Sequence, residues 1–207
     1  MTPQATKEWI DGFLFVGNQL ALDLLNTRPV LSEGSRELLP DAEALIRWLI
    51  ASGVLTPQKG KGLTRTWSNA PKGQAFVQKL RAFRERLRAA VLRHEAGSAV
   101  SDTFIAEVNT LLEQHPSVLV LRRSGEKIGR KIAFEPNEPD DLWAPIATAV
   151  AELLTDVPRH RVRKCESCVV HYYDTSKKGS RRWCSMNICG NKVKVAAYQR
   201  RNRLTAE

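Results

Sequence analysis

The sequence lacks long apolar runs. No window approaches the roughly 18 consecutive apolar residues that a membrane-spanning helix requires. The N-terminal stretch also lacks a basic segment followed by a long apolar one, so we expect no signal peptide. Internal repeats and low-complexity segments are absent too. These absences predict a globular protein of the cytoplasm that has no membrane partner.

Signatures of catalysis are also missing. The sequence contains no glycine-rich phosphate loop and no Gly-x-Ser-x-Gly elbow. Its four histidines are scattered, and none falls in a metal or triad spacing. Asp23 and Asn26, in "LALDLLNT", lie three residues apart on one helix face and are candidates to line a pocket for a small ligand. The alternative is that this pair caps or braces a helix end. We therefore expect a protein that is not an enzyme.

Cysteine is scarce, and all four cysteines lie in one short segment. Cys165 and Cys168 are separated by two residues, fifteen residues follow, and Cys184 and Cys189 are separated by four. In a reducing cytosol such pairs bind metal more often than they form disulfides. Four thiolates complete a tetrahedron around one zinc ion and leave no open position for water, so the expected zinc is structural. His171 is a competing ligand, and the alternative is that it is a surface or packing residue.

Positive charge is concentrated in the same region. Residues 159–203 contain 13 Lys or Arg and two acidic residues, whereas the rest of the chain contains 19 basic and 20 acidic residues. A near-neutral body that carries a strongly basic module predicts a polyanion partner, and nucleic acid is the most plausible one. A solubilising tail is the alternative for a charge run alone.

Apolar periodicity predicts that the rest of the chain is mostly helical. One stripe, spaced by four, three, four and four residues, predicts a helix over 73–95 and consists of Phe76, Leu80, Phe83, Leu87 and Val91. Alternation over 117–135 predicts a β-hairpin with Ser124 and Gly125 in its turn. Further helices are expected over 40–53, 101–116 and 140–156, a loop over 28–39, and a turn-rich segment with one short helical turn over 56–73.

The segment after Cys189 should form a helix. Val193, Ala196 and Ala197 share a face with Cys189, and we expect this face to be a narrow buried stripe between two basic rows. A cysteine knuckle, a loop and a helix that supplies the last ligands form a treble-clef finger. We also expect Asp174 and Ser176 to cap the intervening turn through bonds from side chain to backbone. The candidate nucleic-acid contacts are Lys177, Lys178, Arg181, Arg182, Lys192, Lys194, Arg200, Arg201 and Arg203.

The sequence therefore predicts an α+β fold that is mainly α. A helical domain with a small β-hairpin is expected over residues 1–158, and a treble-clef-like zinc finger over residues 159–207. Pro158 marks the boundary.

The cysteine segment resembles a known family. "CxxC" followed by "YYDTSKKGSRRWCSMNICGNK" is similar to the CGNR-type zinc finger, and "LALDLLNT" with the helical body to about residue 155 resembles the ABATE domain that precedes it. The resemblance implies a stress-induced transcriptional regulator of bacteria, whose finger binds DNA and whose N-terminal domain senses a ligand or mediates assembly. It implies zinc ligands at the four cysteines and basic contacts at Arg181, Arg182, Lys192 and Lys194. The signature arginine is Lys192 here, which keeps the charge but lacks a planar two-pronged donor.

Two kinds of binder follow from these patterns. The first is a regulator that binds duplex DNA, with a homodimer plausible because palindromic sites favour two-fold proteins. A redox variant, in which oxidation releases zinc, stays open. The second is an RNA-binding or protein-docking module, in which Tyr172, Tyr173 and Trp183 stack on single strands. The alternative hypothesis is that these aromatic residues form the core of the finger.

Overall fold

The computed structural model describes residues 8–31, 34–168 and 170–204. They form seven α-helices and four separate two-stranded antiparallel sheets, so the fold is mainly helical, as predicted. The chain divides into two compact units. Unit 1 combines the N-terminal residues up to Leu38 with the residues from His160 onward, and unit 2 spans Leu39–Arg159.

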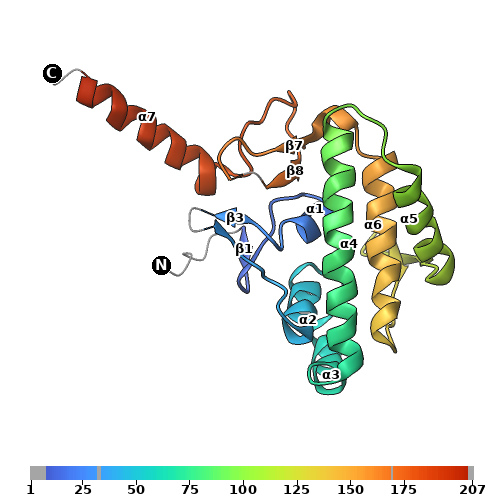
Figure 1. Ribbon diagram of the computed structural model, residues 1–207. Helices are drawn as coiled ribbons and strands as arrows, with labels where there is room; N and C mark the ends of the chain where they lie inside the picture. Colours follow the sequence, from blue (N-terminus) through green and yellow to red (C-terminus); the bar gives the residue numbers. More distant parts are fainter. Residues whose placement is uncertain (1–7, 32–33, 169, 205–207) are drawn as a thin grey trace. The chain divides into compact units, whose positions relative to one another are not determined.

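Unit 2 is a helical bundle with one β-hairpin (Figure 1). Its helices are α2 (Ala42–Ala51), α3 (Pro57–Trp67), α4 (Pro71–Glu95), α5 (Asp102–Gln114) and α6 (Trp143–Thr155), and a short 3-10 turn, Pro139–Leu142, precedes α6. The predicted stripe on α4 is confirmed, because all five of its side chains are at most 1% exposed. Phe83 of this stripe packs edge-on against Trp143 at 5.1 Å between ring centroids.

Local signals define the ends of these helices. Asp41 caps α2 through a 2.8 Å bond from the Ala44 N–H, and Gly53 has a φ of 78° where that helix stops. Ser101 caps α5 in the same way, with a bond from the Phe104 N–H. Both caps agree with the helix starts that the sequence predicts.

The prediction for residues 56–73 is wrong. Helix α3 occupies eleven of these residues, with Thr56 as its N-cap and Pro57 in its first turn. Its two glycines argue against a helix by intrinsic propensity. The structure explains one of them, because a Cβ at Gly60 would collide with the side chain of Ile50 on α2. Tertiary packing of α3 on α2 therefore requires the residue that propensity disfavours.

The predicted hairpin is confirmed as β5 (Val118–Ser124) and β6 (Lys127–Ala133). The strands pair from Val118 with Ala133 to Ser124 with Lys127. The turn therefore lies at Gly125 and Glu126, one residue later than expected, and the φ of 61° at Gly125 fits such a turn.

Unit 1 is built from short elements. Its N-terminal part contains β1 (Trp9–Ile10), β2 (Phe13–Leu14), α1 (Leu20–Leu25), β3 (Val30–Leu31) and β4 (Gly34–Ser35). Its C-terminal part contains β7 (Val162–Lys164), β8 (His171–Tyr173), a π-helical turn (Met186–Gly190) and α7 (Asn191–Leu204), and a 3-10 turn, Arg159–Arg161, precedes β7. The β3–β4 pair lies in the segment predicted as a loop, of which residues 32–33 are outside the described residues. None of the helices in the described ranges is both long and apolar enough to cross a membrane.

Candidate metal centre and nucleic-acid interface

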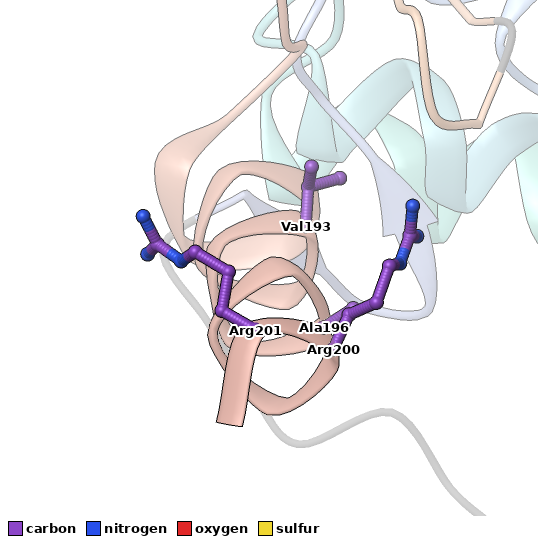
Figure 2. Close-up of a pocket in the computed structure, with 4 residues that line it drawn as sticks. All are labelled: Val193, Ala196, Arg200 and Arg201. Atoms are coloured by element: carbon purple, nitrogen blue, oxygen red, sulfur yellow. The ribbon is translucent and has the colours of Figure 1, made fainter. Parts of the chain in front are cut away.

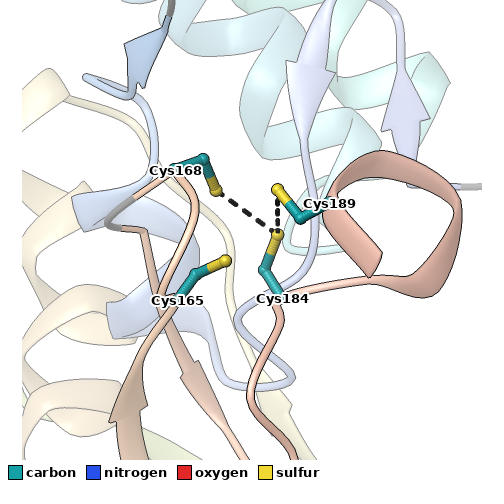
Figure 3. A group of neighbouring side chains, drawn as sticks. All are labelled: Cys165, Cys168, Cys184 and Cys189. Atoms are coloured by element: carbon teal, nitrogen blue, oxygen red, sulfur yellow. Dashed lines mark hydrogen bonds between the residues drawn. The ribbon is translucent and has the colours of Figure 1, made fainter. Parts of the chain in front are cut away.

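The four cysteines converge on one point. Their sulfur atoms all lie within 4.8 Å of one another (Figure 3), with 3.4 Å between Cys168 and Cys184 and 3.7 Å between Cys184 and Cys189. A tetrahedron with zinc–sulfur bonds of ~2.3 Å has sulfur–sulfur edges of about 3.8 Å. The cluster therefore has the donor type, the number of donors and the spacing that one tetrahedral zinc ion requires. No disulfide joins any of the four cysteines.

Local backbone structure presents the two ligand pairs. Cys165 follows β7, and its N–H donates to the carbonyl of Val170 at 2.8 Å, which closes the knuckle. Cys189 lies in the π-helical turn, whose N-cap Ser185 accepts from the Asn187 N–H at 3.1 Å. Gly190 follows Cys189, and a Cβ there would come within 2.5 Å of the Met186 sulfur. A larger residue at this position would therefore displace the exposed Met186 side chain.

The proton balance of the cluster favours a cation. Hydrogen bonds from the Cys168, Cys184 and Cys189 thiols lower the pKa of Cys165 below its usual range. Hydrogen bonding with Cys165, Cys168 and Cys189, together with burial, raises the pKa of Cys184. Hydrogen bonding within the cluster thus favours a thiolate at Cys165 and a protonated thiol at Cys184. Only a bound metal ion stabilises all four thiolates at once.

Residues from the N-terminus complete the finger, which the sequence reasoning missed. Leu14 and Val16 are 3% exposed and pack in one cluster with Tyr172 and three of the cysteines, with Trp9 at its edge. The Tyr173 N–H donates to the Gly17 carbonyl at 2.8 Å. The finger therefore shares its core with a segment about 150 residues earlier in the chain.

Polar contacts join the same two segments. The side chain of Glu8 accepts from Ser185 Oγ at 2.5 Å and from Asn187 Nδ2 at 3.1 Å, so it supports the turn that carries Cys189. Asn18 Nδ2 donates to the Tyr173 carbonyl at 2.9 Å. We call residues 8–26 the N-terminal strap. No spacing motif announces these contacts, although the polar residues in an apolar stretch were a signal that could have been followed.

Asp23 and Asn26, the candidate pocket residues, both belong to this strap. Asn26 is 2% exposed; its Nδ2 donates to the His171 carbonyl at 2.8 Å and its Oδ1 accepts from the His171 N–H at 3.1 Å. The Asp23 carboxylate accepts from the Gly17 N–H at 2.7 Å. These contacts favour the bracing alternative over a ligand pocket. Burial raises the pKa of Asp23 to about 7, although the bonds from Gly17 and Val16 oppose this shift.

The aromatic residues and His171 serve mainly as packing. Tyr172 is fully buried, and its hydroxyl donates to the Arg181 carbonyl at 2.5 Å. Trp183 is partly buried against the cysteine cluster. His171 is 2% exposed and lies outside the group of metal-binding side chains. These contacts therefore support the hypothesis that the side chains form the core of the finger. Tyr172 has no exposed ring face on which a base could stack.

Arg181 and Arg182 differ in their surroundings. The Arg181 guanidinium lies 4.6 Å from the ring centroid of Tyr172, and its Nε donates to the Trp183 carbonyl at 2.8 Å. The exposed Arg182 forms a two-pronged ion pair with Glu166, with distances of 2.6 to 2.9 Å. Arg181 thus holds the finger together, whereas Arg182 presents its charge to solvent beside an acidic neighbour.

The loop after β8 is fixed from within. Asp174 is fully buried, and its carboxylate accepts from the N–H groups of Ser176 and Arg181 at 2.9 Å each, which confirms the cap predicted at Asp174. Although burial opposes the shift, these bonds lower the pKa of Asp174. Arg161 donates to the carbonyls of Asp174 and Ser176, and Arg163 donates to that of Gly179. Arg161 and Arg163 were not among the predicted site residues.

Helix α7 is exposed on all the faces whose side chains are described. Lys192, Lys194, Arg200 and Arg201 are exposed, as are Lys177 and Lys178 on the preceding loop. The expected buried stripe is wrong at Val193, which is 37% exposed, and at Ala196, which is also exposed. Figure 2 shows these two side chains with Arg200 and Arg201 on the same helix. The side chains of Ala197 and Arg203 lie outside the described set.

Comparison with protein families agrees with this geometry. Residues 161–202 match the model of the CGNR zinc finger, and residues 18–157 match the ABATE model, described as "Putative stress-induced transcription regulator". Curated proteins gave no match. The four converging cysteines within the matched finger form the site of one structural zinc ion. Because the ABATE match covers more than half of the chain, the protein belongs to the ABATE family and carries a CGNR zinc finger.

Proposed function

We propose that the protein is a bacterial transcriptional regulator that binds duplex DNA through its zinc finger, with α7 as the main contact element. The observation that carries the proposal is the exposure of basic side chains along a helix that begins directly after the ligand Cys189. Fixing one end of a basic helix reduces the entropy that it loses on binding. A helix of these dimensions fits the major groove of B-DNA.

Charge determines how this interface works. Lysine and arginine side chains on α7 and on the loop at Lys177 and Lys178 neutralise phosphates and release counterions. The apolar side chains of Val193 and Ala196 lie among them and can contact thymine methyl groups. Lys192 stands at the position of the signature arginine, so we expect it to bind phosphate rather than to read guanine.

A mobility-shift titration of the zinc-loaded protein at several salt concentrations tests the proposal. Each neutralised phosphate should contribute about 0.9 to the slope of log K against log salt. Lys194→Ala with Arg200→Ala should lower that slope by up to about 1.8. The matched control is Lys61→Ala with Arg65→Ala, two exposed basic residues on α3, which should leave the slope unchanged.

Two results would count against duplex DNA as the target. Absence of duplex binding at low salt would remove the proposal altogether. Preference for single-stranded RNA over duplex DNA in a competition assay would favour the alternative of an RNA-binding module, for which the exposed Tyr198 on α7 supplies a ring.

We assign the regulatory role to unit 2. An open polar cavity of about 280 Å³ lies between the end of α5, the end of β6 and the turn before α6, and His115, Asn137 and Asp141 are among its lining residues. This cavity is a better candidate for a small ligand than the contacts of Asp23 and Asn26. A metabolite that binds there should raise the melting temperature, and His115→Phe should abolish that shift. A shift that persists in the variant places the ligand elsewhere.

A further inference from the structure

The β5–β6 hairpin is a basic element of the N-terminal body. The hairpin residues 118–133 contain five Lys or Arg and one Glu, a formal charge of +4. The rest of the chain outside residues 159–203 contains 14 Lys or Arg and 19 acidic residues, a formal charge of −5. Helix α4 is also net basic, but several of its cations form ion pairs with carboxylates, such as Lys72 with Glu138 and Arg86 with Glu107. Neither the zinc finger nor the proposed contact on α7 accounts for it.

The hairpin is an isolated two-stranded ribbon among the described residues. Seven residues of β5 pair with seven of β6, and this sheet has no third strand in the ranges that the structure describes. At ~3.4 Å per residue the ribbon is about 24 Å long. The major groove of B-DNA admits either an α-helix or a two-stranded antiparallel ribbon. The ribbon thus has a shape that fits a duplex without rearrangement.

Both faces of the ribbon carry exposed side chains. The register places Leu119, Leu121, Arg123 and Ile128 on one face, where the three apolar side chains are 60%, 72% and 61% exposed. Arg122 and Lys127 are exposed on the other face. No carboxylate of the described residues forms an ion pair with either Arg122 or Arg123, so both guanidinium groups are available to an anion.

We propose that the β5–β6 hairpin is a second DNA-contacting arm, which binds duplex DNA independently of α7. Its basic residues neutralise phosphates, and Leu121 and Ile128 contact base edges or methyl groups in the groove. Charge favours DNA over a second copy of this protein as the partner of the ribbon. Two ribbons of charge +4 repel each other, whereas a polyphosphate chain attracts a ribbon of this charge. This inference rests on the proposed DNA-binding function, and it adds a second, independent surface to it.

The test uses the full zinc-loaded chain and duplex DNA. Arg122→Ala with Arg123→Ala should reduce affinity at 0.1 M salt by about tenfold and lower the salt slope by up to about 1.8, since up to two phosphate contacts are lost. Leu121→Ser with Ile128→Ser should reduce affinity without changing the slope, because no charge is removed. The Lys61 and Arg65 double variant is again the control. Zinc content and the melting temperature must match those of the unaltered protein, because the replaced side chains are exposed.

The outcomes separate this inference from the proposed function. If the unaltered protein binds duplex DNA and the Arg122 and Arg123 variant keeps its affinity and slope, the arm is refuted while α7 binding stands. If the unaltered protein binds no duplex, both fail. Analytical ultracentrifugation, which measures the oligomeric state of the protein, provides the last test. A dimer that the Leu121 and Ile128 substitutions convert to a monomer, with DNA affinity retained, would make the ribbon a self-association surface and overturn the arm.

Discussion

Arg181 and Arg182 are adjacent in the sequence but have different physical roles. Arg181 stacks on the buried Tyr172 and donates to a backbone carbonyl, whereas Arg182 pairs with Glu166 at the surface. Arg181→Ala should therefore destabilise the protein by about 1–2 kcal/mol, because it removes a cation–π contact and a hydrogen bond. Arg182 lies 5.3 Å from the ring centroid of Trp183 but is exposed, so Arg182→Ala should destabilise the protein less than Arg181→Ala and should weaken DNA binding. Urea denaturation and a DNA titration of the two single variants measure the difference.

Glu166 provides the control for this prediction. Glu166→Gln removes the charge that holds Arg182, so it should strengthen DNA binding while changing stability little, since exposed ion pairs contribute little. Unchanged DNA affinity in Arg182→Ala, or no gain in affinity from Glu166→Gln, would show that Arg182 is not a DNA contact.

Asp23 predicts a pH dependence of stability. Its folded pKa of about 7 lies above the ordinary value of 3.8 because burial disfavours its charge. A raised folded pKa means that the stabilising contribution is present at low pH and is lost as pH rises toward and through about 7. Asp23→Asn keeps an oxygen that can accept from the Gly17 N–H. The variant should therefore gain melting temperature relative to the unaltered protein at pH 8 more than at pH 6.

The comparison is restricted to this pH range so that zinc stays bound, since acid protonates the thiolates. Parallel stability curves for the two proteins between pH 6 and 8 would rule out titration of Asp23 in this range. Val16 is buried next to the same site, and Val16→Ala serves as a control that lowers stability without altering its pH dependence.

At the scale of elements, α1 and β8 are joined by one side chain. Asn26, the C-cap of α1, exchanges two buried hydrogen bonds with the backbone of His171. Asn26→Ala leaves a buried N–H and a buried carbonyl without these bonds, which should destabilise unit 1 by about 2–4 kcal/mol. It should also speed the loss of zinc to a chelator, because β8 leads from the cysteine knuckle.

The rate of zinc transfer to a chromophoric chelator checks this prediction. Asn26→Asp keeps the acceptor but buries a charge and sets a second acceptor against the His171 carbonyl, so its rate should be at least as high as that of the alanine variant. If zinc transfer is as slow in Asn26→Ala as in the unaltered protein, α1 does not support the metal site.

Some elements could be predicted from the sequence and others could not, for identifiable physical reasons. The α4 stripe, the caps at Asp41 and Ser101, and the cysteine cluster follow from local spacing. Helix α3 was missed because Gly60 serves a contact with Ile50 that no local rule contains. The exposure of α7 could not be foreseen either, because whether an apolar face has a partner depends on tertiary structure.

The N-terminal strap is the largest feature that the sequence did not reveal. Its contacts with the finger join residues that are 145 to 179 positions apart, such as Asn26 with His171 and Glu8 with Asn187. A domain boundary near residue 158 follows from composition, and the family matches also divide between 157 and 161. The compact units nevertheless place the residues up to Leu38 with the finger.

At the scale of the whole molecule, this organisation links the metal to the N-terminus. Structural zinc supplies ~10–16 kcal/mol to small fingers, more than the typical stability of a small domain. The strap buries Leu14 and Val16 in the same cluster as the cysteines. Removal of zinc should therefore unfold the strap together with the finger, although the two are remote in the sequence. Unit 2 has its own core around α4 and should remain folded.

Hydrogen exchange with and without a chelator tests this coupling. The Phe15, Asp23 and Tyr173 amides each donate to a backbone carbonyl, and all three should lose protection together when zinc is removed. Amides inside α4 should keep theirs, and this difference is the internal control. If the strap amides stayed protected while those of residues 160–204 exchanged freely, the strap would be folded without the finger. Because the strap and the metal stabilise the same cluster, we expect oxidation of the cysteines to have the same effect as the chelator.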